Sequence, residues 1–184
     1  NGLNVVDDDF CARRNLLDEG LHPRNVFVSG SPMPEVLSGI KNKIHESRAL
    51  ENLNLDQGSY LLASIHRQEN VNREESLLGV VSQIVSASKD FRIPAILSLH
   101  PRTQSKLKEF AISIPQDLIR VISPTSLSDY VTLQLGAFAV ISDSGSVSEE
   151  AAYLGFPAVT LRPSMERPEA LESGNVVLVD PLAG

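Results

Sequence analysis

Residues 138–154 read FAVISDSGSVSEEAAYL, in which a short apolar run passes through small polar residues directly into an amphipathic segment. The apolar run at 138–141 predicts a buried strand, and the spacing at 147–154 predicts a helix. A helix that opens straight after a strand leaves several main-chain N–H groups pointing outward at the positive end of its dipole. Such a turn is typical of anion sites in layered α/β proteins.

The same alternation of apolar runs and amphipathic segments extends in both directions along the chain. We predict strands at 25–29, 60–65, 95–99, 118–122, 138–141, 158–161 and 176–179, and helices at 12–19, 34–50, 74–88, 104–110, 127–135 and 147–154. Repeated strand-then-helix units require right-handed crossovers and build a mainly parallel sheet. Strands that are apolar throughout are covered on both sides. The predicted fold class is therefore α/β, a Rossmann-like sheet with helices on both faces.

Length and composition favour one globular domain in a reducing, cytoplasmic compartment. The chain has 184 residues, of which 42% are hydrophobic, and its single cysteine is Cys11, so no internal disulfide is expected. A net charge of −7 argues against nonspecific nucleic-acid binding, which needs a basic surface. No apolar stretch approaches the about 20 residues needed to span a bilayer. Asp7, Asp8 and Asp9 occupy the place where a signal peptide would carry positive charge.

Both ends of the sequence look cut. The chain begins at Asn1 without a methionine, in what we interpret as a connector leading into a helix, and ends at Gly184 soon after the last predicted strand. We therefore expect a domain taken from a longer protein.

Polar residues follow five of the predicted strands, each time at the carboxyl end of the strand. They are Gly30 and Ser31 after the first, His66, Arg67, Glu69 and Asn70 after the second, His100 and Arg102 after the third, Asp143, Ser144, Gly145, Ser146 and Glu150 after the fifth, and Arg162, Glu166 and Arg167 after the sixth. In open α/β sheets, ligands bind outside the carboxyl ends of the strands. We therefore predict one shared site at this edge.

The turn at residues 143–146 has a functional and a structural interpretation. Ser144 offers a hydroxyl donor, Gly145 lets a phosphate approach the backbone, and Glu150 can accept from ribose hydroxyls. On the structural interpretation, Asp143 or Ser144 is simply a helix N-cap. The sequence by itself leaves the two interpretations equally open.

The histidines and arginines also allow two interpretations. His66 can donate to a phosphate or assist its departure, because its pKa lies near the working pH. Taken alone, a histidine at a strand end, such as His66 or His100, is more often a structural hydrogen-bonding residue. Arg102, Arg162 and Arg167 can bind phosphate or carboxylate in bidentate fashion, or pair with a neighbouring glutamate.

Several common site types are absent from the sequence. It has no Gly-x-Gly-x-x-Gly after the first predicted strand, no Walker A loop and no Gly-x-Ser-x-Gly nucleophile turn. The four histidines and one cysteine show no metal-ligand spacing. We expect neither a metal nor a cofactor.

Several motifs resemble those of a known family. Residues 142–151 read SDSGSVSEEA, 154–157 LGFP, 166–169 ERPE, 66–70 HRQEN and 12–17 ARRNLL. These motifs extend across residues 10–180. In their order along the chain, they resemble the motifs of the non-hydrolysing UDP-N-acetylglucosamine 2-epimerases. GSPM at 30–33 and HPRT at 100–103 look like the branch that acts on UDP-2-acetamido-2,6-dideoxy-L-talose and forms UDP-N-acetyl-L-fucosamine. Ser146 stands where the family commonly has a second glycine.

The resemblance implies a fold and an activity. Residues 1–184 would form the C-terminal, UDP-binding half of a GT-B-like two-domain fold. The N-terminal domain, with the catalytic carboxylates, would lie outside this sequence, so the chain alone would be inactive. The complete protein would be an isomerase and a homodimer without cofactors. It would invert C2 of a UDP-N-acetylhexosamine by anti elimination of UDP and re-addition, for surface polysaccharide synthesis.

The resemblance also implies roles for individual residues. Ser144 would hold the diphosphate and Glu150 the ribose. His66 would be the catalytic residue of this half, since it contacts the diphosphate and stabilises UDP as it leaves. Gly30 and Arg162 would line the nucleotide pocket.

Two other functions remain open at this point. A GT-B-type glycosyltransferase domain would also bind UDP but would transfer the sugar to an acceptor. A non-catalytic UDP-sugar sensing module would bind without turnover. Exchange of the C2 proton in D₂O would distinguish an epimerase from both.

Overall fold

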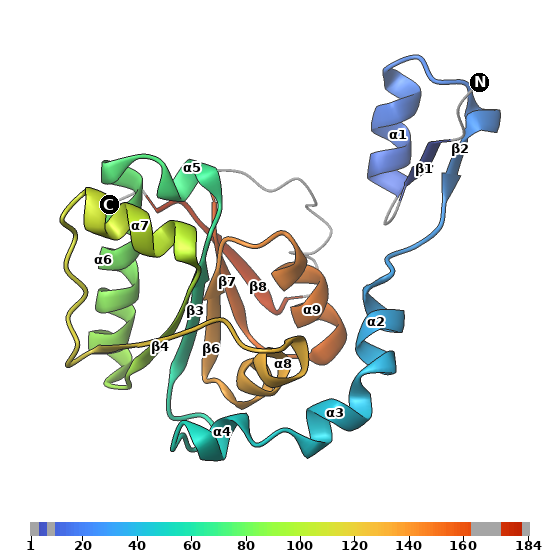
Figure 1. Ribbon diagram of the computed structural model, residues 1–184. Coiled ribbons are helices and arrows are strands. Elements are labelled where there is room, and N and C mark those ends of the chain that lie inside the picture. Colours follow the sequence, from blue (N-terminus) through green and yellow to red (C-terminus); the bar gives the residue numbers. More distant parts are fainter. Residues whose placement is uncertain (1–3, 7–9, 163–173, 182–184) are drawn as a thin grey trace. The chain divides into compact units, whose positions relative to one another are not determined.

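The computed structural model describes residues 4–6, 10–162 and 174–181 (Figure 1). The chain divides into two compact units, residues 1–40 and 41–184. Within the described part of the chain, no helix is long and apolar enough to cross a membrane.

The first unit is a small strand–helix–strand motif followed by a helix. Strand β1 (Asn4–Val6) pairs in parallel with β2 (Val26–Val28), and α1 (Phe10–Asp18) and the 3₁₀ turn η1 (Pro23–Asn25) lie between them in the sequence. Helix α2 (Met33–Gly39) closes the unit. We had interpreted the start of the chain as a connector, and this was wrong for residues 4–6. A strand of three residues is too short to show an alternation of apolar and polar positions.

The second unit contains a six-stranded parallel sheet in the order β5-β4-β3-β6-β7-β8. The strands are β3 (Leu61–Ile65), β4 (Ala95–Leu99), β5 (Ile119–Ile122), β6 (Ala139–Ser142), β7 (Ala158–Leu161) and β8 (Val176–Val179). The helices are α3 (Lys41–Glu46), α4 (Ala49–Asn52), α5 (Gln68–Val71), α6 (Glu74–Phe91), α7 (Pro101–Glu109), α8 (Leu127–Gly136) and α9 (Ser146–Leu154). After β3, strands β4 and β5 are added on one side of it. Strand β6 then pairs with the other side of β3, and β7 and β8 follow beyond β6. The order therefore reverses between β3 and β6.

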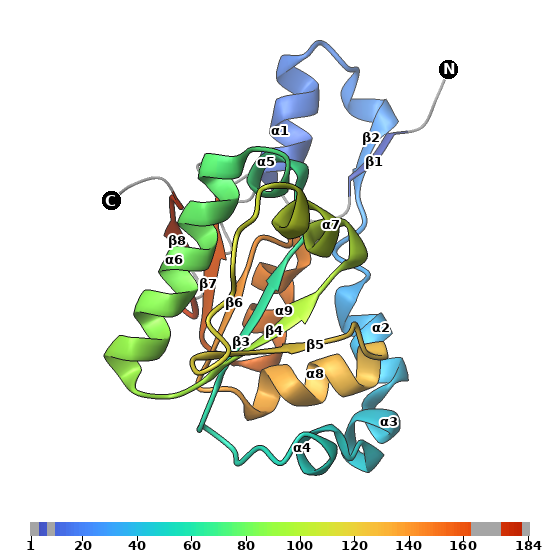
Figure 2. The same cartoon turned by 60° about the vertical axis from the view of Figure 1, so that its left-hand side comes forward.

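Helices cover both faces of the sheet, with α6 on one face and α8 and α9 on the other (Figure 2). Alternate residues of β3 show how the strand serves both layers. Leu61 packs in the cluster that includes Ile84 of α6, and Leu62 packs in the cluster that includes Leu133 of α8 and Val147 of α9. The predicted α/β, Rossmann-like class with a parallel sheet is confirmed.

The structure differs from the predicted helices in three places. The single helix expected at 34–50 is three helices, because the chain breaks at Ile40 and again at Ser47. The Ser47 hydroxyl accepts from the main-chain N–H of Ala49, which begins α4 separately. Helix α7 begins at Pro101 instead of 104, since His100 caps it and proline suits the first turn. Helix α5 lies in residues to which we had assigned no helix.

Candidate functional site

The loops after β3 and β6 meet at the carboxyl edge of the sheet, where the strand order reverses. The two strands pair directly, with Leu61 opposite Ala139 and Ser64 opposite Ser142. The His66 loop and the Asp143 turn therefore leave neighbouring strands at the same edge. Ligands of open α/β sheets bind at this kind of switch point, so the central part of the predicted site has the expected position.

A buried carboxylate holds these two loops together. Asp143 has no exposed surface and accepts from the main-chain N–H groups of His66 at 3.1 Å and Arg67 at 2.9 Å. The Asn70 amide donates to the same carboxylate at 3.2 Å and to the carbonyl of Leu161 at 2.9 Å. The Nδ1 atom of His66 lies 3.3 Å from the Asp143 Oδ1. These contacts fix the loop after β3 against the turn after β6, and Asn70 extends the link to β7.

The N-cap interpretation of Asp143 is wrong. The N-cap of α9 is Gly145, which has no side chain to accept from the first turn. Ser144 is not the N-cap either, although its hydroxyl accepts from the main-chain N–H of Ser146 at 3.3 Å and lies 2.9 Å from the Ser146 hydroxyl. The turn therefore places two hydroxyl groups beside the positive end of a helix without a side-chain cap.

The guanidinium of Arg67 lies against this helix start. A Cβ atom built on Gly145 would stand 3.0 Å from the Arg67 Nη2, and this close approach is possible because residue 145 is glycine. A cation beside the positive end of a helix dipole is unfavourable by itself. The arrangement becomes favourable when an anion lies between the two.

An acidic side chain lies between two arginines of the site. Glu69 Oε1 is 3.5 Å from the Arg67 Nη1 and 3.9 Å from the Arg162 Nε. The ion-pair interpretation of Arg162 thus holds, although the arginine is buried, with 5% of its surface exposed. Its position after β7 places it beside the loop of the central strand pair.

Sequence reasoning missed the polar partner of Glu150. The Gln134 amide, on α8, donates to the Glu150 Oε2 at 2.6 Å, and both side chains are buried. Nearby on α8, burial raises the pKa of Tyr130 to about 12, while a hydrogen bond with Ser64 works in the opposite direction. A glutamine in a helix ordinarily indicates an exposed position, so the sequence carried no signal for this pair.

His100 has a structural contact at the start of α7. It is the N-cap of α7, and its Nδ1 accepts from the main-chain N–H of Arg102 at 3.2 Å. Thr103, which we had not predicted, donates to the Ile65 carbonyl at 2.6 Å and ties α7 to the end of β3. Helix α7 also contacts α5 (Gln68–Val71), so its start lies near the loop at 66–70.

Two further groups of predicted residues belong to other parts of the chain. Gly30 and Ser31 follow β2, a strand of the two-stranded sheet in the first unit. Our expectation that they follow a strand of the same sheet as the other clusters was therefore wrong. Gly30 has a positive φ of 81°, which favours glycine. Glu166 and Arg167 lie outside the described residues.

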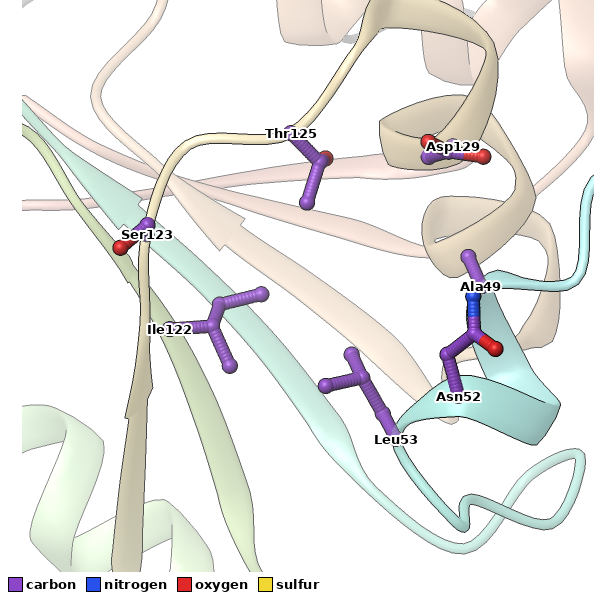
Figure 3. A pocket seen from close by; sticks show the side chains of 7 residues that line it. All are labelled: Ala49, Asn52, Leu53, Ile122, Ser123, Thr125 and Asp129. Atoms are coloured by element: carbon purple, nitrogen blue, oxygen red, sulfur yellow. The ribbon is translucent and has the colours of Figure 1, made fainter.

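A separate hollow of about 330 Å³ lies between α4, β5 and α8 (Figure 3). Ala49, Asn52, Leu53, Ile122, Ser123, Thr125 and Asp129 line it. Hydrogen bonds from Ser47 and Ser126 lower the pKa of Asp129 below its ordinary value. None of the predicted site residues lines this hollow. Within residues 4–6, 10–162 and 174–181, no group of three His, Cys, Asp or Glu side chains could hold a metal.

The fold and the polar edge at its switch point define a Rossmann-like α/β protein. The family profile of UDP-N-acetylglucosamine 2-epimerase matches residues 10–183, and the chain belongs to this family.

Relatives of known sequence and structure extend this result. UDP-N-acetylglucosamine 2-epimerase of Methanocaldococcus jannaschii is 35% identical over 174 residues, covering 91% of this chain and 48% of the relative. A crystal structure of that enzyme in complex with UDP-GlcNAc and UDP matches with a TM-score of 0.85 at 32% identity, covering 92% of this chain and 48% of the other. The Rickettsia bellii UDP-N-acetylglucosamine 2-epimerase matches with a TM-score of 0.82 at 34% identity, covering 97% and 47%.

The chain spans about half the length of the known relatives it matches. Which half it forms, and to which branch of the family it belongs, stay predictions.

Proposed function

We propose that this chain is the UDP-binding, C-terminal half of a UDP-N-acetylhexosamine 2-epimerase. The contact that carries the proposal is the Arg67 guanidinium against Gly145 at the start of α9. The Arg67 guanidinium, which also lies near Glu69, and the positive end of the helix dipole together favour a ligand with at least two negative charges, and a diphosphate fits. Relatives from M. jannaschii and Neisseria meningitidis, the latter 26% identical, have structures with bound UDP-GlcNAc, which supports the choice of nucleotide.

The residues around this contact have distinct roles in the proposal. The hydroxyls of Ser144 and Ser146 and the main-chain N–H groups at the start of α9 bind the diphosphate, with His66 and Arg67 on its other side. Glu150, farther along α9, binds the ribose. Asp143 has no exposed surface, so it acts as a positioning residue that orients the His66 loop.

In the proposed reaction, a base removes the C2 proton and the C1–O bond breaks as the C1–C2 double bond forms. The electron pair of the broken bond stays on the diphosphate, and UDP leaves a glycal. Re-addition of UDP with protonation from the opposite face gives the C2 epimer. The C2 proton is weakly acidic, so the step needs stabilisation of the leaving diphosphate. Because Nδ1 of His66 faces Asp143, its Nε2 is the atom available to the diphosphate.

The proposal also includes the substrate branch, the biological role, the location and the assembly of the complete protein. These assignments include the branch that acts on UDP-2-acetamido-2,6-dideoxy-L-talose, a role in surface polysaccharide synthesis, a cytoplasmic location, a homodimer, and catalytic carboxylates on the companion half. Deuterium exchange at C2 in D₂O, measured with the complete protein and a panel of UDP-N-acetylhexosamines, tests the reaction and its substrate. Transfer of the sugar to an acceptor without exchange would instead indicate a glycosyltransferase.

The binding role can be tested with this chain alone. We expect saturable UDP binding in a calorimetric or NMR titration up to millimolar ligand, weakened by about 1–3 kcal/mol in Ser144→Ala and in Glu150→Ala. Ser82→Ala, an exposed serine of α6, is the matched control. Unchanged affinity in both site variants would place the nucleotide elsewhere.

A further inference from the structure

Helices α8 and α9 lie on the same face of the sheet and share one buried polar contact. Gln134 of α8 is 1% exposed, and its Nε2 donates to the Glu150 Oε2 of α9 at 2.6 Å. The other amide atom of Gln134, Oε1, is buried without a hydrogen-bond partner. Gln134 thus satisfies a carboxylate oxygen and leaves its own carbonyl oxygen unsatisfied.

Packing does not explain a glutamine at this position. A buried acceptor without a partner costs free energy, whereas an apolar side chain of similar length has no polar atom to satisfy. Turning the amide over does not remove this cost, because its carbonyl oxygen would then face the Glu150 carboxylate. The glutamine is therefore explained by what its N–H group does to Glu150.

The effect of Gln134 on Glu150 is to separate the two carboxylate oxygens. Oε2 is occupied by the amide, and no described residue donates to Oε1. Because Oε1 is not among the fully buried atoms without a partner, it retains access to solvent although 8% of the residue is exposed. The carboxylate is thus held with one oxygen directed inward and one left as an acceptor.

We propose that Gln134 is a positioning residue that makes the site selective for a nucleoside diphosphate with an intact ribose diol. It fixes the Glu150 carboxylate so that Oε1 accepts from a ribose hydroxyl. A deoxygenated sugar leaves this oxygen without a donor, and discrimination by a buried acceptor that lacks its partner is strong. This inference rests on the proposed function, since it assumes that Glu150 binds the ribose.

The test compares two nucleotides, UDP and 2′,3′-dideoxy-UDP, with the 184-residue chain and its variants. We expect the unmodified chain to prefer UDP by about tenfold or more. Gln134→Met should weaken UDP binding and leave the dideoxy compound unaffected, so that the ratio falls to that of Glu150→Ala. Gln83→Met, on α6, is the matched control and should keep the full ratio. In the Glu150→Ala background, Gln134→Met should change the ratio no further.

A purely structural role predicts a different pattern. Gln134→Met would then lower the thermal midpoint and weaken both nucleotides equally, and an unchanged ratio would overturn the inference while leaving the proposed function in place. Absence of UDP binding by the unmodified chain would overturn both. If Gln134→Met does not fold, Gln134→Leu replaces it, with the midpoint and the ratio measured in the same way.

Discussion

The carboxylate of Asp143 accepts a hydrogen bond from the main-chain N–H of Arg67 at 2.9 Å, across 76 positions of the sequence. The same carboxylate accepts from His66 and Asn70. The loop that carries His66 and Arg67 is therefore ordered by a residue that is itself inaccessible to a ligand.

Asp143→Asn should disturb this order with little change in shape. The asparagine amide would present N–H groups toward the N–H donors of the loop, so we expect a loss of about 1–3 kcal/mol in unfolding free energy. UDP affinity should fall by about tenfold or more, together with shifts of the His66 and Arg67 amide resonances. Asp117→Asn, at an exposed aspartate outside the loops at 66–70 and 143–146, is the control. Unaltered amide resonances of the loop would show that the carboxylate does not order it.

Gly145→Ala tests the approach of Arg67 to the helix start. The added methyl would stand 3.0 Å from the Arg67 Nη2, so the guanidinium must shift by a few tenths of an ångström. The φ of −67° suits alanine, and the stability change should stay at about 1 kcal/mol or less. We expect a several-fold loss of UDP affinity in a calorimetric titration. Gly39→Ala, which meets no atom within 4 Å, should leave the affinity unchanged, and an equal loss in both variants would contradict the proposed contact.

Ser47→Ala should produce a stability difference that depends on pH. The Ser47 hydroxyl donates to the Asp129 Oδ1 at 2.5 Å, and this bond lowers the pKa of Asp129 from its ordinary value of 3.8. A lowered folded-state pKa gives stability that is fully present above the unfolded pKa and is lost as pH falls through the folded value.

We therefore expect Ser47→Ala to cost about 1 kcal/mol at pH 7 and progressively less below about pH 4, measured by urea unfolding across that range. Ser113→Ala, at an exposed serine, should show no such trend. A difference that stays constant down to pH 2 would mean that Asp129 is not the partner that matters.

Gly136→Ala should destabilise the end of α8. Its Cβ would stand 2.9 Å from the Tyr60 hydroxyl oxygen and 3.0 Å from the Leu50 Cδ2, and crowding of this kind costs about 1–3 kcal/mol. In the Tyr60→Phe background the nearest atom is removed, so the same change should cost less. Additive effects of the two substitutions in thermal unfolding would contradict this steric account.

The sequence predicted the sheet better than it predicted the connections. Apolar runs such as 95–99 fall on their strands without error, since a strand covered on both faces must be apolar. The predicted helix at 34–50 is broken at Ile40 and at Ser47; at the second break, Ser47 bonds with Asp129, 82 positions away, and periodicity contains no such information. The strand at residues 4–6 was missed because a run of three residues is too short to show a periodic pattern.

The candidate site was predictable as an edge and not as a set of contacts. The rule for strand ends correctly placed the loop at 66–70 beside the turn at 143–146. It could not show that Asp143 is buried, because an aspartate in a polar turn has the same sequence signature whether it contacts a ligand or orders a loop. Gln134 carried no signal, since its partner lies on another helix.

The central position of β3 and β6 has a consequence for how the protein folds. They are neighbours in the sheet, yet β4, β5 and the intervening helices α5 to α8 separate them along the chain. Contacts of such long sequence separation form slowly, because the loop between them must close first. A nucleotide in the proposed site would therefore bind only after the segment between β3 and β6 has folded, and by mass action it would stabilise the complete sheet and no shorter intermediate.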